Sequence, residues 1–113
     1  MHEYSIVASL VDRVDEIAAT RPGAIVRKLH VRIGELAGVE IDLLQTAFAT
    51  FRERTVCDRA DLAIEAVPAV WRCKSCGRDI PAGTVLRCCQ QPARLVSGDD
   101  IILERVEMEV RDV

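Results

Sequence analysis

The chain has 113 residues, with 15 basic and 18 acidic side chains and a formal net charge of −3. This length fits one compact unit with at most a small second lobe, and the acidic balance argues against a sequence-independent nucleic-acid binder, which needs a basic face. No apolar run approaches the roughly 20 residues that span a bilayer, and the first residues lack the basic region of a secretory signal. We therefore expect a cytoplasmic protein.

The predicted elements of the first half follow from the spacing of apolar side chains. Residues 4–19 place them at steps of three and four, which predicts an amphipathic helix ended by a Pro-Gly pair. Residues 25–33 alternate apolar and polar side chains, which predicts a half-buried strand. A loop over residues 34–40 leads to a second helix, which we expect to start near Asp42 with that side chain as its N-cap.

The second half contains two more predicted strands, separated by a segment of different composition. Apolar side chains alternate over residues 62–66 and stop at Pro68. The segment of about residues 69–98 carries four of the cysteines. From Asp100 the chain alternates again, which predicts a final strand whose apolar face needs a partner. Its simplest partner is the sheet formed by the first two strands.

This order of elements predicts the fold class α/β (α+β), a small sheet of about three strands with two helices, plus an inserted zinc-ribbon-like lobe. The expected domains are an α/β domain formed by residues 1–67 and 99–113 and a zinc-binding domain formed by residues 68–98. A lobe of this size is too small to be stabilised by its own hydrophobic core. A bound metal ion can supply the missing stability.

Four of the five cysteines fall within 17 residues and have the spacing of a metal site. Cys73 and Cys76 form a Cys-x-x-Cys pair followed by Gly77, which allows the backbone to bend back so that its N–H groups face the sulfurs. Cys88 and Cys89 supply a second pair after a short loop. Four thiolates usually hold a structural zinc ion, because catalytic zinc keeps one coordination position open.

The second cysteine pair is irregular, because Cys88 and Cys89 are adjacent in sequence. Neighbouring residues of an extended segment point to opposite sides, so both sulfurs can bind one ion only if the backbone turns sharply there. Otherwise the fourth ligand is a water, a carboxylate such as Asp79 or a residue of another chain. We interpret all four cysteines as zinc ligands. Cys57 stands alone and is interpreted as a small buried hydrophobic residue.

The first residues offer a second and different set of ligands. His2 is bulky enough to leave Met1 uncleaved, so that the α-amine, the His2 amide nitrogen and the His2 imidazole can form fused chelate rings around one ion. Glu3 can supply a further ligand. Nitrogen-rich planar coordination suits Ni(II) or Cu(II) better than Zn(II). On spacing alone, a solvated histidine without a ligand is the more common outcome at such a position.

Four motifs together resemble one protein family over essentially the whole chain. They are Met-His-Glu-Tyr-Ser at residues 1–5, Ile-Gly-Glu-Leu-Ala-Gly at 33–38, Cys-x-x-Cys-Gly at 73–77 and Leu-Val-Ser-Gly-Asp-Asp at 95–100. This order of motifs resembles the HypA/HybF family of nickel metallochaperones for [NiFe]-hydrogenase maturation. The Met-His-Glu start is the most specific of the four.

The resemblance implies a non-enzymatic carrier that helps to load Ni(II) into the hydrogenase large subunit. The implied partners are a HypB-type GTPase and that large subunit, and some relatives also serve urease with its accessory proteins. A homodimer is compatible with the family, whereas nucleic acid and membrane are not expected partners. Nickel is expected to bind transiently and zinc to stay as a structural ion.

The resemblance also implies which residues bind each metal. Nickel binding carries over to His2, with Met1 and Glu3 contributing backbone nitrogens, and Glu40 matches an acidic residue implicated in some relatives. The family binds zinc through two Cys-x-x-Cys pairs. Cys73 and Cys76 match the first pair, while Cys88 and Cys89 match the second only in a degenerate form.

Two rival interpretations use the same cysteine segment. A zinc-ribbon module without a nickel role would contact nucleic acid or another protein, and Trp71 with the neighbouring basic side chains is its only support. A thiol redox protein would use Cys73 and Cys76 and would show a lowered thiolate pKa. Four clustered thiols and an acidic total charge favour metal binding over both.

Overall fold

The computed structural model describes residues 2–81 and 83–110, apart from the side chain of His2. It contains two helices and eight short or medium strands within these residues. In chain order they are α1 (His2–Ala19), β1 (Ile25–Gly34), α2 (Ile41–Phe51), β2 (Asp61–Val67), β3 (Val70–Arg72), β4 (Asp79–Ile80), β5 (Arg87–Cys88), β6 (Gln91–Pro92), β7 (Arg94–Ser97) and β8 (Ile101–Glu109). The predicted mixed class with two helices and a three-stranded sheet is confirmed.

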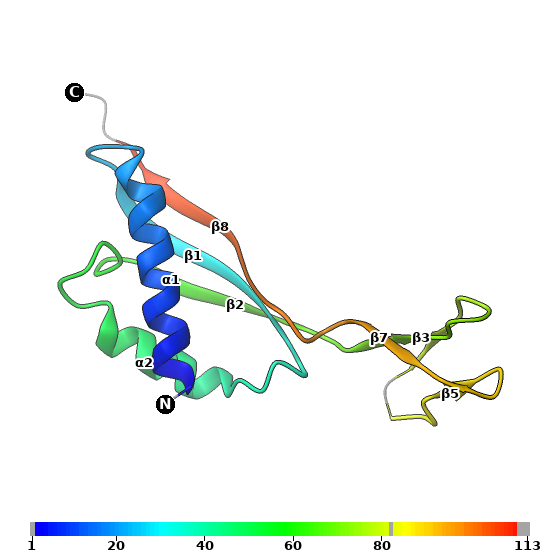
Figure 1. The fold of residues 1–113 in the computed structure, drawn as a ribbon. Helices are drawn as coiled ribbons and strands as arrows, with labels where there is room; N and C mark the ends of the chain where they lie inside the picture. The colour runs from blue at the N-terminus through cyan, green and yellow to red at the C-terminus, as the bar shows by residue number, and fades with distance from the viewer. Residues whose placement is uncertain (1, 82, 111–113) are drawn as a thin grey trace.

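The main sheet has the strand order β2-β1-β8. Strand β2 runs parallel to β1 because α2 forms the crossover between them. Strand β8 runs antiparallel to β1 along its other edge, so the final strand joins the first two as predicted. Figure 1 shows both helices on the same side of this sheet, and the molecule is elongated, with extents of 62 × 30 × 16 Å.

The cysteine segment forms a separate lobe beyond the end of the main sheet (Figure 1). Its three-stranded sheet has the order β4-β3-β7, and β5 and β6 form a hairpin. Trp71 in the central strand lies opposite Ile80 on one side and Leu95 on the other. The lobe is inserted between β2 and β8, so two chain segments connect it to the main sheet.

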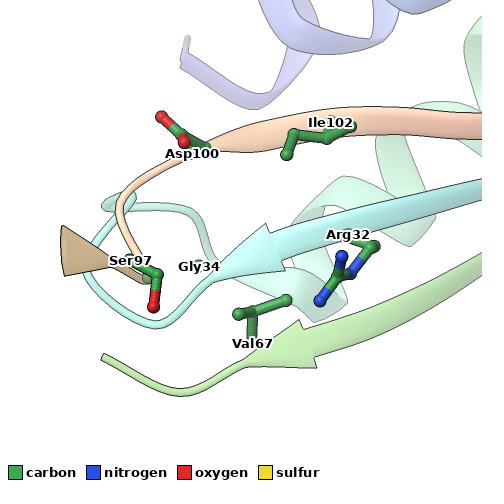
Figure 2. A pocket seen from close by; sticks show the side chains of 7 residues that line it. Arg32, Gly34, Val67, Ser97, Asp100 and Ile102 are labelled. Atoms are coloured by element: carbon green, nitrogen blue, oxygen red, sulfur yellow. The ribbon is translucent and has the colours of Figure 1, made fainter. Parts of the chain in front are cut away.

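These two connecting segments cross the end of β1 at very short range. Figure 2 shows Gly34, the last residue of β1, between Val67 and Asp100. The Gly34 amide donates a hydrogen bond to the Asp100 carbonyl at 2.8 Å. A Cβ atom on Gly34 would lie 2.1 Å from the carbonyl carbon of Gly98, so only glycine fits there. A small cavity of about 100 Å³ remains beside this crossing.

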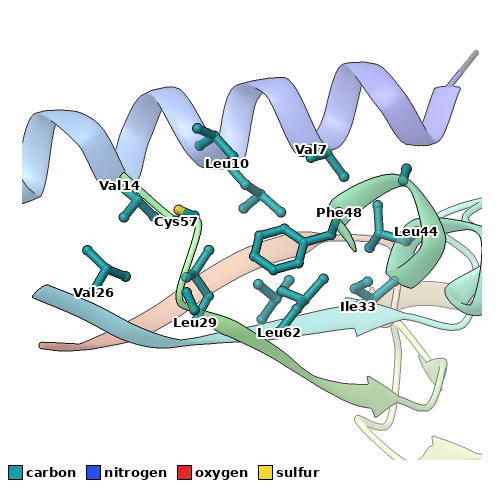
Figure 3. Close-up of a cluster of buried hydrophobic side chains, with 14 residues drawn as sticks. Val7, Leu10, Val14, Val26, Leu29, Ile33, Leu44, Phe48, Cys57 and Leu62 are labelled. Atoms are coloured by element: carbon teal, nitrogen blue, oxygen red, sulfur yellow. The ribbon is translucent and has the colours of Figure 1, made fainter. Parts of the chain in front are cut away.

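The hydrophobic core lies between the two helices and the inner face of the main sheet (Figure 3). Helix α1 contributes Val7 and Val14, which are completely buried. Phe48 from α2 and Leu29 from β1 belong to the same buried cluster. Cys57 is also completely buried in this cluster, and burial raises the pKa of its thiol to about 11. The prediction of Cys57 as a small buried hydrophobic residue is confirmed.

The start of α2 differs from the sequence prediction. The helix begins at Ile41, Glu40 occupies the N-cap position, and Asp42 lies within the first turn. The side-chain amide of Gln45, three residues after Asp42, donates to the Leu62 carbonyl at 2.8 Å. The tertiary contact with β2 therefore prevails over local capping. Within the described residues, neither helix combines the length and apolar character needed to cross a membrane.

Candidate metal centre

The first cysteine pair lies in the turn between β3 and β4. The Cys73 amide donates to the Arg78 carbonyl at 2.9 Å, and the Gly77 amide donates to the Cys73 carbonyl at 3.0 Å. Gly77 has a φ of +73°, a conformation that glycine adopts without a steric penalty. These bonds close a tight turn, which brings the Cys73 and Cys76 side chains to the same side.

The second pair lies in the turn of the β5–β6 hairpin. Cys89 and Gln90 are the two residues between these strands, with φ values of +53° and +60°. Positive φ at both central residues is the geometry of a two-residue type I′ hairpin turn, which Asn and Gly normally occupy. The sharp turn that adjacent ligands require is therefore present at Cys89. The Arg87 guanidinium supports it with a 3.1 Å hydrogen bond to the Gln90 carbonyl.

The turns bring all four cysteine sulfurs together within 4.8 Å of one another. The Cys88 sulfur lies 3.8 Å from that of Cys76 and 3.9 Å from that of Cys89. A tetrahedral zinc ion with Zn–S bonds of about 2.3 Å separates its sulfur ligands by about 3.8 Å. Two sulfur pairs match this separation and all four sulfurs lie close enough together to surround one ion, so the donor set fits zinc.

Asp79, the carboxylate named as an alternative fourth ligand, has a different partner. The Asp79 carboxylate accepts a 2.8 Å hydrogen bond from the Arg72 guanidinium on the neighbouring strand. Cys57 lies in the core of the other lobe. Among the described residues, the four clustered cysteines are the one group of His, Cys, Asp and Glu side chains with metal-binding geometry.

The four thiols differ in their surroundings. Cys73 is 3% exposed, whereas Cys76 and Cys89 are exposed. The Cys76 backbone N–H donates to the Cys73 sulfur and is the main reason that the pKa of Cys73 is lowered to about 6. Hydrogen bonds to the Cys73 and Cys76 sulfurs raise the pKa of Cys88 to about 12, and the Cys73 sulfur is the main reason that the pKa of Cys89 is raised.

Metal binding at this site should depend steeply on pH. In the metal-free protein at neutral pH, Cys73 is a thiolate, whereas Cys88 and Cys89 keep protons that a metal must displace. The metal must displace at least these two protons, so the apparent zinc affinity falls at least about a hundredfold for each unit that the pH decreases between 8 and 6. Competition with a zinc chelator at three pH values measures this slope, and an affinity independent of pH would contradict it.

Of the residues predicted to bind nickel, the structure places the His2 backbone and Glu3 in the first turn of α1 and Glu40 at the N-cap of α2, in the other lobe. The Glu40 backbone N–H lies 3.4 Å from the Glu3 Oε2 atom, so the loop before α2 contacts the first turn of α1. Glu40 is exposed, and its side chain makes no capping hydrogen bond. Met1 and the side chain of His2 lie outside the described part of the chain.

Sequence reasoning missed Glu35. Its Oε1 atom accepts a hydrogen bond from the buried Ala69 amide at 2.8 Å, where one connecting segment enters the cysteine lobe. An isolated glutamate in a predicted loop gives no signal of such a contact. The glycine immediately before it was the available sign of a close backbone approach.

A helix-covered sheet joined to a lobe whose four cysteines have the geometry to hold a metal ion defines a small metal-binding protein of mixed α and β structure. Comparisons with known proteins agree with this class. Residues 1–108 match the family described as "Hydrogenase/urease nickel incorporation, metallochaperone, hypA". The chain therefore belongs to the HypA family. This family consists of metallochaperones and maturation factors and not of enzymes, which confirms both the resemblance seen in the sequence and the prediction of a non-enzymatic protein.

Individual relatives match over nearly their full length. The hydrogenase maturation factor HypA of Wolinella succinogenes is 38% identical, with 99% of this chain and 98% of that protein covered. The same factor of Aquifex aeolicus is 36% identical, with 97% and 99% covered. A solution structure of a HypA protein superimposes with a TM-score of 0.78 at 29% identity and 98% coverage of both chains. That of the Ni metallochaperone HypA from Helicobacter pylori gives 0.68 at 28% identity, with 96% and 98% covered.

Proposed function

We propose that this protein is a nickel carrier that binds Ni(II) at its N-terminus and helps to insert it into the large subunit of a [NiFe]-hydrogenase or into urease. The observation that carries the proposal is the match of residues 1–108 to a nickel-incorporation family. The proposed ligands are the α-amine of Met1, the amide and imidazole nitrogens of His2 and the backbone of Glu3. The carboxylate of Glu40 adds negative charge nearby.

The local structure supports a nitrogen site at this position. Helix α1 begins at His2, so the amides of His2 and Glu3 have no carbonyl one helical turn earlier to bind. A metal that displaces their protons therefore costs no helical hydrogen bond. The N-terminus of a helix carries partial positive charge, which disfavours a cation. The carboxylates of Glu3 and Glu40 offset this charge.

The four-cysteine site is proposed to hold zinc as a permanent structural ion. The sulfur spacing and the all-thiolate donor set favour a closed tetrahedral zinc site. Under this assignment residues 68–98 are a zinc-binding domain, and residues 1–67 with 99–113 are the nickel-binding domain. This division separates a tightly held ion from a transferable one, which is what a carrier needs.

The proposed partners follow from the family. A nickel carrier for hydrogenase works with a HypB-type GTPase and the hydrogenase large subunit, and in urease maturation with urease accessory proteins. These steps take place in the cytoplasm, where the thiols stay reduced and available for zinc. A homodimer is compatible with this role.

Removal of the His2 imidazole tests the nickel site. We expect His2→Ala to weaken Ni(II) binding at least about a hundredfold, because the chelate loses its only side-chain nitrogen and a planar nitrogen site is what selects nickel. Isothermal titration of the zinc-loaded protein with its native start measures the affinity.

A protein with extra residues before Met1 is the second variant, since it blocks the α-amine but keeps every side chain. We expect the same loss of nickel affinity in it. The matched control is His30→Ala, which removes the second histidine of the chain, a residue on the outer face of β1. It should bind nickel normally. Zinc content should be unchanged in all variants. Tight nickel binding in both altered proteins would remove the N-terminal site.

A further inference from the structure

The orientation of the cysteine lobe depends on a small junction. The main sheet and the lobe sheet are separate, and no strand of one pairs with a strand of the other among the described residues. Figure 1 shows the lobe projecting away from the helices. The contacts at the junction therefore decide how the two lobes are held relative to each other.

A single short segment of the chain contacts both connections at this junction. The Glu35 amide donates to the Val67 carbonyl at 2.8 Å, on the connection that enters the lobe. The Leu36 amide donates to the Gly98 carbonyl at 2.7 Å, on the connection that leaves it. The two connections also contact each other directly, because a Cβ on Gly98 would lie 2.5 Å from the Ala69 Cα atom.

Among the described residues, the Glu35 carboxylate supplies the one side-chain hydrogen bond at this crossing. It accepts from the Ala69 amide at 2.8 Å, one residue before β3 begins. Ala69 is 7% exposed, so without Glu35 its amide loses a partner where water has little access. The backbone bonds of Glu35 and Leu36 fix the path of the loop, and the carboxylate fixes the first residue of the lobe to it.

The same loop reaches the start of α1 at its other end. It runs from Gly34 at the junction to Glu40 at the N-cap of α2, and the Glu40 amide lies 3.4 Å from the Glu3 carboxylate. One loop therefore contacts the root of the cysteine lobe and the first turn of α1. Loss of a contact at the Gly34 end of the loop therefore weakens the connection between the cysteine lobe and the first turn of α1.

We propose that Glu35 is a positioning residue, whose hydrogen bond to the Ala69 amide holds the cysteine lobe at a fixed orientation to the helix-covered sheet. The lobe is then presented as one rigid unit with the surface around α1. The proposal concerns the zinc-loaded chain without nickel. The positioning role of Glu35 can therefore fail while the nickel function stands, and the nickel function can fail while the positioning role stands.

Two substitutions at Glu35 test this role in the zinc-loaded full-length chain. Glu35→Ala removes the acceptor, and Glu35→Gln keeps a side-chain oxygen at the same reach. In the alanine variant we expect the Ala69 amide to exchange with solvent about tenfold faster, as for the loss of one hydrogen bond. We also expect 15N relaxation to give the two lobes different correlation times. The glutamine variant should resemble the wild type in both measurements.

Glu53→Ala, at an exposed acidic residue after α2, is the matched control for loss of charge and should change neither measurement. If the Glu35 variants keep the zinc content and the helical circular dichroism of the wild type, the measured changes reflect a change in lobe orientation and not unfolding. If the alanine variant does not fold, Glu35→Asp keeps the charge but withdraws the carboxylate, and the same two changes are expected in it. The proposal would be overturned if, in Glu35→Ala or its substitute Glu35→Asp, the Ala69 amide exchanged at the wild-type rate and both lobes had the same correlation time.

Discussion

In the Cys73→Ala protein we expect zinc content to fall below about a tenth of the wild-type value, together with loss of fixed structure in the lobe formed by β3 to β7. Zinc binding contributes on the order of 10–16 kcal/mol to folding in small structural sites, and this lobe is too small to be stable without it. Cys73 is the most buried of the four thiols, at 3% exposure, so solvent has little access to the position that its sulfur would leave. Metal analysis and amide signals from the lobe measure the two effects.

Cys57→Ala is the matched control, because Cys57 is equally buried but lies in the core of the helix-covered sheet. It should keep its full zinc content. Signals from α1, α2 and β1 should also persist in Cys73→Ala, because their packing does not use the metal. Retention of stoichiometric zinc after loss of Cys73 would show that the four sulfurs do not bind a common ion.

Gly34→Ala should destabilise the whole protein by about 3 kcal/mol or more, an effect that single substitutions reach only by a specific steric or polar mechanism. The new Cβ would lie 2.1 Å from the Gly98 carbonyl carbon and 2.6 Å from the Asp99 amide nitrogen. These are backbone atoms of a connection that is itself packed against Ala69, so they cannot move aside as a flexible side chain would. Urea denaturation followed by circular dichroism measures the free energy of unfolding.

Gly38→Ala separates crowding from backbone strain. Gly38 has a φ of +74° and no atom within 4 Å of a built Cβ, so alanine there costs only the unfavourable left-handed conformation, about 1–2 kcal/mol. Gly34 has an ordinary φ, and its whole cost is steric. Equal free energies of unfolding for the two variants would indicate that the backbone around Gly34 is less tightly packed than in the structure.

Hydrophobic periodicity was sufficient to predict the main fold. The alternation in β1 and the helical spacing in α1 gave the two layers, and the unpartnered apolar face of β8 indicated its place in the sheet. Boundaries set by tertiary contacts were not predictable in the same way. Asp42 has the chemistry of an N-cap, yet the N-cap lies two residues earlier, at Glu40, and Gln45 binds the Leu62 carbonyl.

The composition of the candidate site was predictable from the sequence, whereas its geometry was predictable only at the first cysteine pair. The Cys-x-x-Cys-Gly turn at Cys73 indicates its own shape, because Gly77 allows the required positive φ. Nothing in the sequence at Cys89 and Gln90 indicates positive φ, since neither residue favours it, and the turn is fixed by pairing of β5 with β6. Glu35 was missed because its partner, Ala69, is 34 residues away in the chain.

The central position of β1 has a consequence for biosynthesis. Its partner on one side, β2, follows after a single helix, whereas its partner on the other side arrives much later, with His30 and Glu107 separated by 77 positions. A nascent chain therefore exposes one unpaired edge of β1 until the cysteine segment and then β8 have emerged from the ribosome. Non-local pairing of this kind slows folding and favours aggregation of the waiting edge. Early capture of a metal by the cysteines would shorten the loop that must close and bring β8 into register sooner.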